Sequence, residues 1–269
     1  MDDPIGLIAG GGRLPVLVAE GMRAQGHRVV CISLAGNHDP QLVPLCDRLK
    51  SVGLTRLGSW IRHLRRFGAK QAVMVGYVRK TSMYDPCRYL KHIPDLRTLR
   101  LWFKHKRQDM RTNTMLVALA GELDASGVRL IDGAQFFKQH MATHGNLTTH
   151  RPADAQMKEI EHGWRYHQIL SDLDISQAIA VSGRRILAIE AIEGTDALIR
   201  RAGTLCQGQA WTLIKATKPN QDLRLDLPVI GTQTILNMKE AGGMCLAIEV
   251  GKVIMVDKPL IIEAANASG

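Results

Sequence analysis

The first 132 residues alternate short apolar runs with segments of helical periodicity. The apolar runs have the length of buried strands; they are IGLIA (5–9), RVVCISL (28–34), QAVMVG (71–76) and VRLID (128–132). Apolar positions recur at helical spacing over 16–25, 59–67 and 114–127, and Ser59 is a candidate N-cap. Alternating strands and helices favour right-handed crossovers and a parallel sheet. We therefore predict a Rossmann-like N-terminal domain over residues 1–132.

The second half of the chain has a different pattern. Residues 133–154 are rich in His, Thr and Asn and lack clear periodicity, so we predict a linker there and expect its His140 and His144 to be surface residues. The predicted elements that follow are helices over 155–171, 195–203 and 232–242, a strand over 211–217, a hairpin over 177–192 turning at Ser182-Gly183, and a hairpin over 244–257 turning at Gly251. We therefore expect a C-terminal mixed α/β domain over 155–269, whose strand order the sequence does not specify.

Composition narrows the class of protein. No apolar run approaches the roughly 18 residues of a membrane span, and the start MDDP does not resemble a signal peptide. The five cysteines are scattered without CxxC spacing, which suits buried, reduced thiols. We expect a cytoplasmic globular protein.

The net charge of +10 is concentrated in one stretch. Residues 79–111 hold ten Lys or Arg against three Asp, an excess of seven. If 95–111 is a helix, Arg97, Arg100, Lys104 and Arg107 share one face, and Leu96, Leu99 and Phe103 share another. Such a helix can simply be solvated, or it can contact an anionic membrane on its periphery. Nucleic acid is the weakest candidate, because no nucleic-acid-binding motif accompanies the charge.

A glycine loop follows the first predicted strand. Gly10, Gly11 and Gly12 stand where a doubly wound fold holds a phosphate, although they can also make a purely structural turn. Pro15 replaces the third glycine of the dinucleotide fingerprint, no acid ends the second strand and no Walker lysine is present. A nicotinamide cofactor is therefore disfavoured.

The strand over 71–76 should end at the same sheet edge. Gly76 and Tyr77 would then face the same crevice as the glycine loop, and Tyr77 could stack on a uracil. The alternative is that Gly76 only closes the strand.

A second glycine precedes a helix in EGTDALIRR (193–201). Thr195 or Asp196 can cap that helix. With Gly194 before them, they can instead form a second anion-binding helix start, and Asp196 can serve a metal.

The segment KATKPNQDLRLDLPVIG (215–231) concentrates charge between two prolines. Asp222 and Asp226 share a side in either a helical or an extended segment, so both can reach one hard cation such as Mg²⁺. Either carboxylate can instead orient a water as general base. Lys215 and Arg224 could neutralise a phosphate. The alternative is a solvated charged loop.

These segments together resemble one family. GLIAGGGRLPVLVAE, SWIRHLRRFGAKQAVMVGYV, EAIEGTDALIRRAG and KPNQDLRLDLPVIG are similar, in this order, to the LpxI family of UDP-2,3-diacylglucosamine pyrophosphatases. The resemblance implies Mg²⁺-dependent hydrolysis of the UDP-linked lipid to UMP and 2,3-diacylglucosamine 1-phosphate, a step of lipid A synthesis on the cytoplasmic side. It also implies a homodimer of two α/β domains with substrate bound between them, and it assigns the essential aspartate to Asp226 and substrate contact to the Gln221 block.

Two features depart from the family pattern. Arg111-Thr112-Asn113 stands where we expect an acidic pair, which keeps open a hydrolase of another UDP-sugar or a non-catalytic binding protein for a nucleotide-linked or lipid ligand. The chain also ends at Gly269, earlier than the resemblance leads us to expect, so we expect a final strand to be missing.

Overall fold

The computed structural model describes residues 3–77, 93–106, 112–173, 175–191, 193–218, 224 and 227–269. The chain forms two compact units. Unit 1 comprises the described residues up to Lys138 together with Arg224, and unit 2 comprises the described residues from Gln139 onward other than Arg224. The boundary falls inside the predicted linker.

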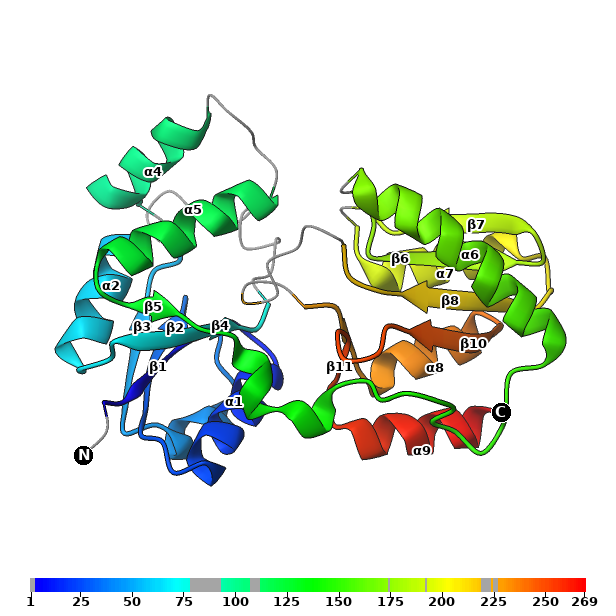
Figure 1. Cartoon of the computed structure of the whole chain (residues 1–269), viewed down its shortest axis with the longest axis horizontal. Coiled ribbons are helices and arrows are strands. Elements are labelled where there is room, and N and C mark those ends of the chain that lie inside the picture. The colour runs from blue at the N-terminus through cyan, green and yellow to red at the C-terminus, as the bar shows by residue number, and fades with distance from the viewer. Residues whose placement is uncertain are drawn as a thin grey trace. The chain divides into compact units, whose positions relative to one another are not determined.

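The sheet of unit 1 is entirely parallel. Its strands are β1 (Ile5–Ala9), β2 (Val29–Leu34), β3 (Arg48–Val52), β4 (Gln71–Val75) and β5 (Arg129–Leu130). They lie in the order β3-β2-β1-β4-β5 (Figure 1). The predicted Rossmann-like sheet is confirmed, with β3 as an unpredicted edge strand. β3 reads RLKSV and is mostly exposed, so it lacks the apolar run that identifies a buried strand.

Helices cover both faces of this sheet. They are α1 (Leu14–Ala24), α2 (Leu57–Arg66), α4 (Leu96–Lys106) and α5 (Thr112–Ala125), with 3₁₀ turns η1 (Pro40–Leu45), η3 (Gly133–Phe136) and η4 (Lys138–His140). Side chains from α2, α4 and α5 pack against the strand face that carries Val30 and Ile32. α1 contacts β1 and β2, and it buries residues such as Val16 and Met22.

The start of α2 corrects the predicted cap. The helix begins two residues before Ser59, and the Ser59 hydroxyl lies 3.3 Å from His63 Nδ1. The carboxylate of Asp95 accepts the Gly58 N–H at 2.7 Å and the Thr98 N–H at 2.9 Å. Asp95 therefore caps α4 locally, because it immediately precedes that helix, and it also satisfies an orphan N–H group at the start of α2. The second contact joins residues distant in sequence, which local sequence could not reveal.

The main sheet of unit 2 is mixed. Its strands are β6 (Ala178–Ser182), β7 (Arg185–Ile189), β8 (Trp211–Lys215) and β10 (Gly243–Ile248), in the order β10-β8-β6-β7. β6 runs antiparallel to both of its neighbours, whereas β8 and β10 are parallel. The predicted hairpin turning at Ser182-Gly183 is confirmed. The predicted hairpin at Gly251 is wrong, because β10 pairs with β8 while β11 (Ile254–Met255) pairs in parallel with β9 (Val229–Ile230).

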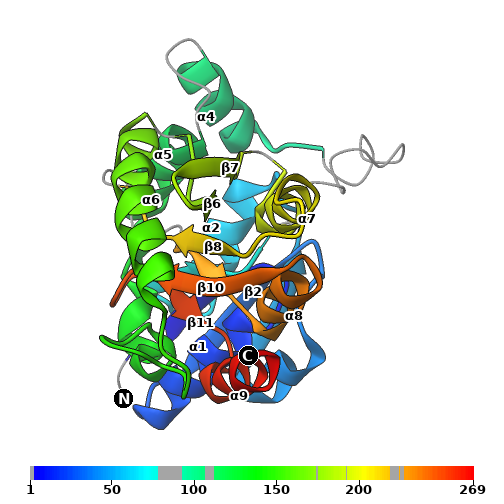
Figure 2. The ribbon, with the colours of Figure 1, turned by 90° about the vertical axis from the view of Figure 1, so that its right-hand side faces the viewer.

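The helices of unit 2 divide between the two faces of its sheet. They are α6 (Asp154–Asp172), α7 (Thr195–Leu205), α8 (Thr232–Glu240) and α9 (Lys258–Ser268). Figure 2 shows α6 on one side of the strands and α7 with α8 on the other. α6 packs closely, since a Cβ on Gly163 would lie 2.4 Å from Ile214. The described helices include none long and apolar enough to cross a membrane.

Candidate functional site

In unit 1 the glycine loop lies against the end of β4. The Gly10 N–H donates to Val75 O at 2.9 Å, and Gly11 and Tyr77 exchange N–H···O bonds of 2.8 and 3.1 Å. Because β1 lies between β2 and β4, the strand order reverses beside this loop. Such a switch point is where open α/β sheets bind ligands, outside the carboxyl ends of the strands.

Close packing makes these glycines necessary. A Cβ on Gly10 would lie 2.7 Å from Tyr77 O, and Gly76 has a φ of +97°. The Tyr77 ring packs over the loop, within 2.9 Å of where a Cβ on Gly12 would be. The residue is still 52% exposed. Thus the structure brings together Gly10, Gly76 and a partly exposed aromatic ring, as the sequence predicts.

In unit 2 three strands deliver polar residues to one edge of the main sheet. Glu190 follows β7, Lys215 ends β8 and Glu249 follows β10. The strand directions place these ends together: Glu190 N–H donates to Ala178 O at 2.8 Å, and Glu249 N–H donates to Lys215 O at 3.2 Å. We call the residues Glu190, Thr195, Lys215, Thr217 and Glu249 the polar edge.

A buried hydrogen-bond chain organises part of the polar edge. Lys215 is only 5% exposed, and its Nζ donates to Thr195 Oγ1 at 2.6 Å. Thr195 Oγ1 donates in turn to Glu190 Oε1 at 3.0 Å. Glu190 Oε2 is buried and has no hydrogen-bond partner among the residues that the structure describes. Buried carboxylate oxygens are normally satisfied, so an unpartnered one indicates a place for a water, an ion or a ligand group.

One interpretation of the sequence, that Thr195 or Asp196 caps α7, is wrong. Gly194 is the N-cap, with a φ of +86°. The Thr195 hydroxyl is committed to Lys215 and Glu190. Asp196 Oδ1 accepts from Asn237 Nδ2 at 3.0 Å.

Glu249 is held as an anion at the other end of the polar edge. Its Oε2 accepts from the Thr217 N–H at 2.8 Å and the Thr217 hydroxyl at 2.6 Å, and its Oε1 pairs with Lys252 at 2.8 Å. Burial alone would raise the pKa of Glu249, but the bonds from Lys252 and Thr217 outweigh it and lower this pKa. The sequence analysis missed both Glu249 and Glu190, because neither stands in a recognisable motif.

Other predicted site residues lie elsewhere or outside the description. Arg224 belongs to unit 1, where its Nη1 lies 3.4 Å from Leu130 O. Gln221, Asp222 and Asp226 lie outside the described residues, so their predicted roles stay predictions. Within the described ranges, no three His, Cys, Asp or Glu side chains gather closely enough to hold a metal.

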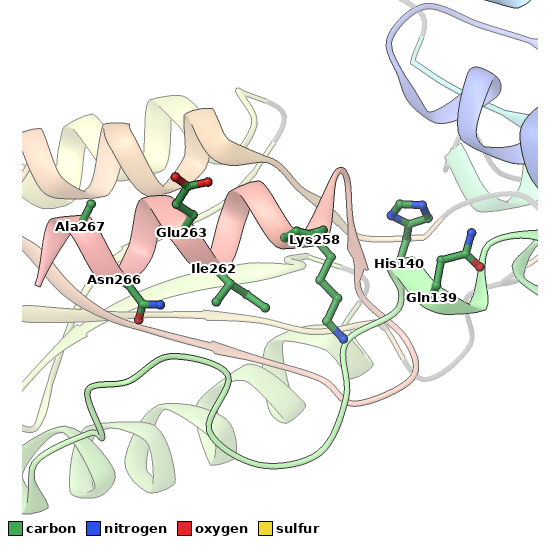
Figure 3. Close-up of a pocket in the computed structure, with 8 residues that line it drawn as sticks. Gln139, His140, Lys258, Ile262, Glu263, Asn266 and Ala267 are labelled. Carbon is green, nitrogen blue, oxygen red and sulfur yellow. The ribbon is translucent and has the colours of Figure 1, made fainter.

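A groove of about 930 Å³ runs beside α9 in unit 2. Figure 3 shows that its polar side chains diverge, with Glu263 on one side of the helix and Asn266 on the other. The Lys258 ammonium is bonded to Met141 O at 3.1 Å and Thr143 Oγ1 at 3.0 Å. His140 lines this groove, and its Nδ1 is buried with no hydrogen-bond partner in the described part of the chain. The expectation that His140 is a simple surface residue is therefore wrong. Its polar groups do not converge on a common point.

A second cavity, of about 770 Å³, lies wholly within unit 2 and is lined mainly by apolar side chains. It borders β10, α6, α8 and α9. The sequence did not predict this cavity, because its lining residues are spread over more than 120 positions between Thr143 and Gly269.

Comparison with known proteins gives a consistent assignment. Residues 4–140 match the LpxI N-terminal domain and residues 143–269 match the LpxI C-terminal domain. The chain is 31% identical over 277 residues to the UDP-2,3-diacylglucosamine pyrophosphatase LpxI of Caulobacter vibrioides, covering 98% of this chain and 95% of that protein.

Two solved structures that match the chain show much weaker similarity. The Bordetella bronchiseptica enzyme WbmG in complex with NAD and UDP matches at a TM-score of 0.30 and 19% identity, over 48% of this chain and 36% of that one. An ADP complex of purK, N5-carboxyaminoimidazole ribonucleotide synthetase, matches at 0.27 and 15%, over 77% and 45%. These scores are too low to bear on function. The two domain matches and the full-length similarity show that the chain belongs to the LpxI family.

Proposed function

We propose that this protein hydrolyses the diphosphate of UDP-2,3-diacylglucosamine, releasing UMP and 2,3-diacylglucosamine 1-phosphate in lipid A synthesis. The observation that carries the proposal is the similarity of nearly the whole chain to an enzyme with that name. Both domains match the family in order.

Lys215 supplies positive charge to the diphosphate. A buried ammonium interacts with an anion more strongly than a solvated one, because the local dielectric is low. Its bond to Thr195, itself bonded to Glu190, restricts where the ammonium points. Preorganised charge of this kind favours the transition state, since no reorganisation is needed as charge develops on the phosphate oxygens. Arg224 adds a second cation.

The catalytic carboxylate is Asp226. It orients the attacking water as general base or holds a metal, and Asp222 is the second metal ligand in this proposal. Mg²⁺ would neutralise phosphate oxygens and lower the pKa of a bound water. The unpartnered Glu190 Oε2 fits a site that takes a cation or its water, and it is the described oxygen most suited to this role.

The remaining predicted residues bind the substrate. Gly10, Gly11 and Gly12 present a tight backbone at the switch point, and Tyr77 beside Gly76 stacks on the uracil. The diphosphate-sugar part contacts Gly194, Thr195, Asp196 and Gln221, so the substrate binds residues of both domains.

We also propose a homodimer that contacts anionic membrane through residues 79–111. α4 supports this contact, because Leu96 is 86% exposed and Phe103 is 61% exposed. Arg100 and Lys104 are exposed on the same helix. Exposed apolar side chains beside cations are typical of helices that bind the surface of anionic bilayers.

The test is UMP release from UDP-2,3-diacylglucosamine, followed with Mg²⁺ and with EDTA. A folded protein that binds this substrate without releasing UMP would favour a non-catalytic binding protein. Hydrolysis of other UDP-sugars alone would favour a different substrate. Thr112 and Asn113, which depart from the family pattern, lie in the first turn of α5. If a variant with acidic residues at these two positions releases UMP and the unaltered protein does not, the local departure accounts for the missing activity.

A further inference from the structure

Three consecutive residues at the end of β8 are held by hydrogen bonds from other elements. Lys215 O accepts the Glu249 N–H at 3.2 Å, and the Ala216 N–H donates to Gln177 O at 3.0 Å. The Thr217 N–H and hydroxyl donate to Glu249 Oε2 at 2.8 and 2.6 Å. Glu249 therefore binds the chain on both sides of Ala216, once through its backbone and twice through its carboxylate.

The bonds between Glu249 and Thr217 are sheltered and charge-assisted. Thr217 is only 8% exposed, so water does not readily take the place of the carboxylate. The lowered pKa of Glu249 keeps its carboxylate ionised at neutral pH. Hydrogen bonds to an ionised group are about twice as strong as those between neutral groups. The end of β8 is therefore held more firmly than its pairing with β10 alone would hold it.

The turn that carries Glu249 is tied to another part of unit 2. The Gly251 N–H donates to Ala142 O at 2.8 Å, and the Ala142 N–H donates to Val253 O at 2.9 Å. Within the turn, the Lys252 N–H lies 3.4 Å from Glu249 O. These bonds restrict the backbone of Glu249, so its carboxylate has a defined position from which to hold Thr217.

The position of the Lys215 ammonium depends on this backbone. Lys215 Nζ donates to Thr195 Oγ1 at 2.6 Å, and a shift of the backbone at Lys215 would change that contact. In sequence, Thr217 also begins the segment that leads to Asp226. The carboxylate of Glu249 thus acts on the end of β8 from the side opposite to the Thr195 contact.

We propose that Glu249 is a positioning residue for the hydrolysis, which acts through Thr217 and Lys215 without touching the substrate. The inference rests on the proposed function, which places the diphosphate at Lys215. A misplacement of about 1 Å in such a site can cost ~100-fold in rate. Charge that develops on the phosphates in the transition state is affected most, so loss of the Glu249 carboxylate should slow turnover more than it weakens substrate binding.

The first test compares the two partners of the Glu249 carboxylate. Glu249→Gln keeps the shape of the side chain and removes its charge. We expect kcat for UMP release to fall ~10-fold or more, with less than about a twofold change in KM. Lys252→Gln is the matched control. It removes the 2.8 Å ion pair to Glu249 Oε1, leaves the bonds to Thr217 in place, and should keep the turnover of the unaltered protein.

The second test removes the same contact from the side of Thr217. Thr217→Val lacks the hydroxyl that donates to Glu249 at 2.6 Å and should lower kcat in the same direction as Glu249→Gln. Thr217→Ser keeps the hydroxyl and should recover most of the activity that Thr217→Val loses. All variants are assayed below their unfolding transitions, so that a loss of folded protein is not counted as a loss of kcat.

Amide hydrogen exchange tests the contact without any assay of activity. Glu249→Ala removes the acceptor of the Thr217 N–H. We expect exchange of this amide to become ~10-fold faster or more, because a bond to a charged group is lost. Amides of β1 in unit 1 are the internal control and should keep their exchange rates.

The outcomes separate the inference from the proposed function. Unchanged kcat in Glu249→Gln and Thr217→Val, or a rise in KM alone, would overturn the positioning role. An equal loss of kcat in Lys252→Gln would also contradict it, because that variant keeps the bonds to Thr217. If the unaltered protein releases no UMP, the proposed function fails. Amide exchange then decides whether Glu249 holds the end of β8, and an unchanged rate at Thr217 in Glu249→Ala would show that it does not.

Discussion

Replacing Thr195 by Val should disconnect the buried chain from Lys215 to Glu190. Valine has nearly the shape of threonine but lacks the hydroxyl, so the change removes the bonds of 2.6 Å to Lys215 Nζ and 3.0 Å to Glu190 Oε1. The backbone of α7 keeps its glycine N-cap. The perturbation is therefore confined to the polar edge.

The magnitude follows from the burial of these groups. A hydrogen bond to a charged group contributes about 1.5–3 kcal/mol, and a buried group left unsatisfied costs its desolvation penalty. Lys215 is nearly fully buried, so solvent will not replace the lost bond. We expect Thr195→Val to lower the free energy of unfolding by ~2–3 kcal/mol, which corresponds to a Tm lower by about 5–10 °C for a unit of this size.

Thr195→Ser is the matched control, since it keeps the hydroxyl and loses only a methyl group. Thermal unfolding and UMP release should be measured for both variants. Thr195→Val should lose stability and at least ~10-fold in kcat, because Lys215 is no longer oriented, while Thr195→Ser stays close to the unaltered protein. Equal behaviour of the two variants in both assays would refute the proposed role of the hydrogen-bond chain.

Three further predictions concern stability and surface binding. Asp95→Ala should lower the free energy of unfolding by ~1–2 kcal/mol, because its carboxylate caps both α2 and α4; Asp95→Asn should lose less, and equal losses in chemical denaturation would contradict the capping role. Burial lowers the pKa of His167 in the folded protein, against the opposing effects of Gln177 and Glu249. The stability that neutral His167 contributes is complete above the unfolded-state pKa of about 6.5 and declines as pH falls below it. His167→Gln should therefore reduce the fall in Tm between neutral and mildly acidic pH, and an unchanged dependence of Tm on pH would contradict this prediction. Finally, Phe103→Ser should weaken sedimentation with anionic vesicles, whereas neutral vesicles should bind neither protein; unaltered sedimentation would exclude α4 as the contact.

Local patterns predicted the regular parts of the fold well. Buried strands such as β1 and β6 form apolar runs, and Gly183 marks the hairpin between β6 and β7. The pattern failed at β10 and β11, where two apolar segments around Gly251 join different sheets. Strand pairing depends on partners distant in sequence, which the hydrophobic pattern does not encode.

The candidate site was predictable only where glycines or clustered charges stand together. Gly10, Gly76 and Tyr77 were expected at one sheet edge, and the structure places them there. Glu190 and Glu249 were missed, because a single acid after a strand is indistinguishable from a solvated surface residue until the sheet brings the strand ends together. The apolar cavity was missed for the same reason.

The most direct test of the proposed function is release of UMP from UDP-2,3-diacylglucosamine by the purified full chain, compared with Asp226→Ala. The account predicts release that requires Mg²⁺, stops with EDTA and is abolished by Asp226→Ala while substrate binding is retained. Unchanged turnover in Asp226→Ala would contradict the catalytic assignment, and absence of release from a folded, substrate-binding chain would contradict the proposed hydrolysis itself.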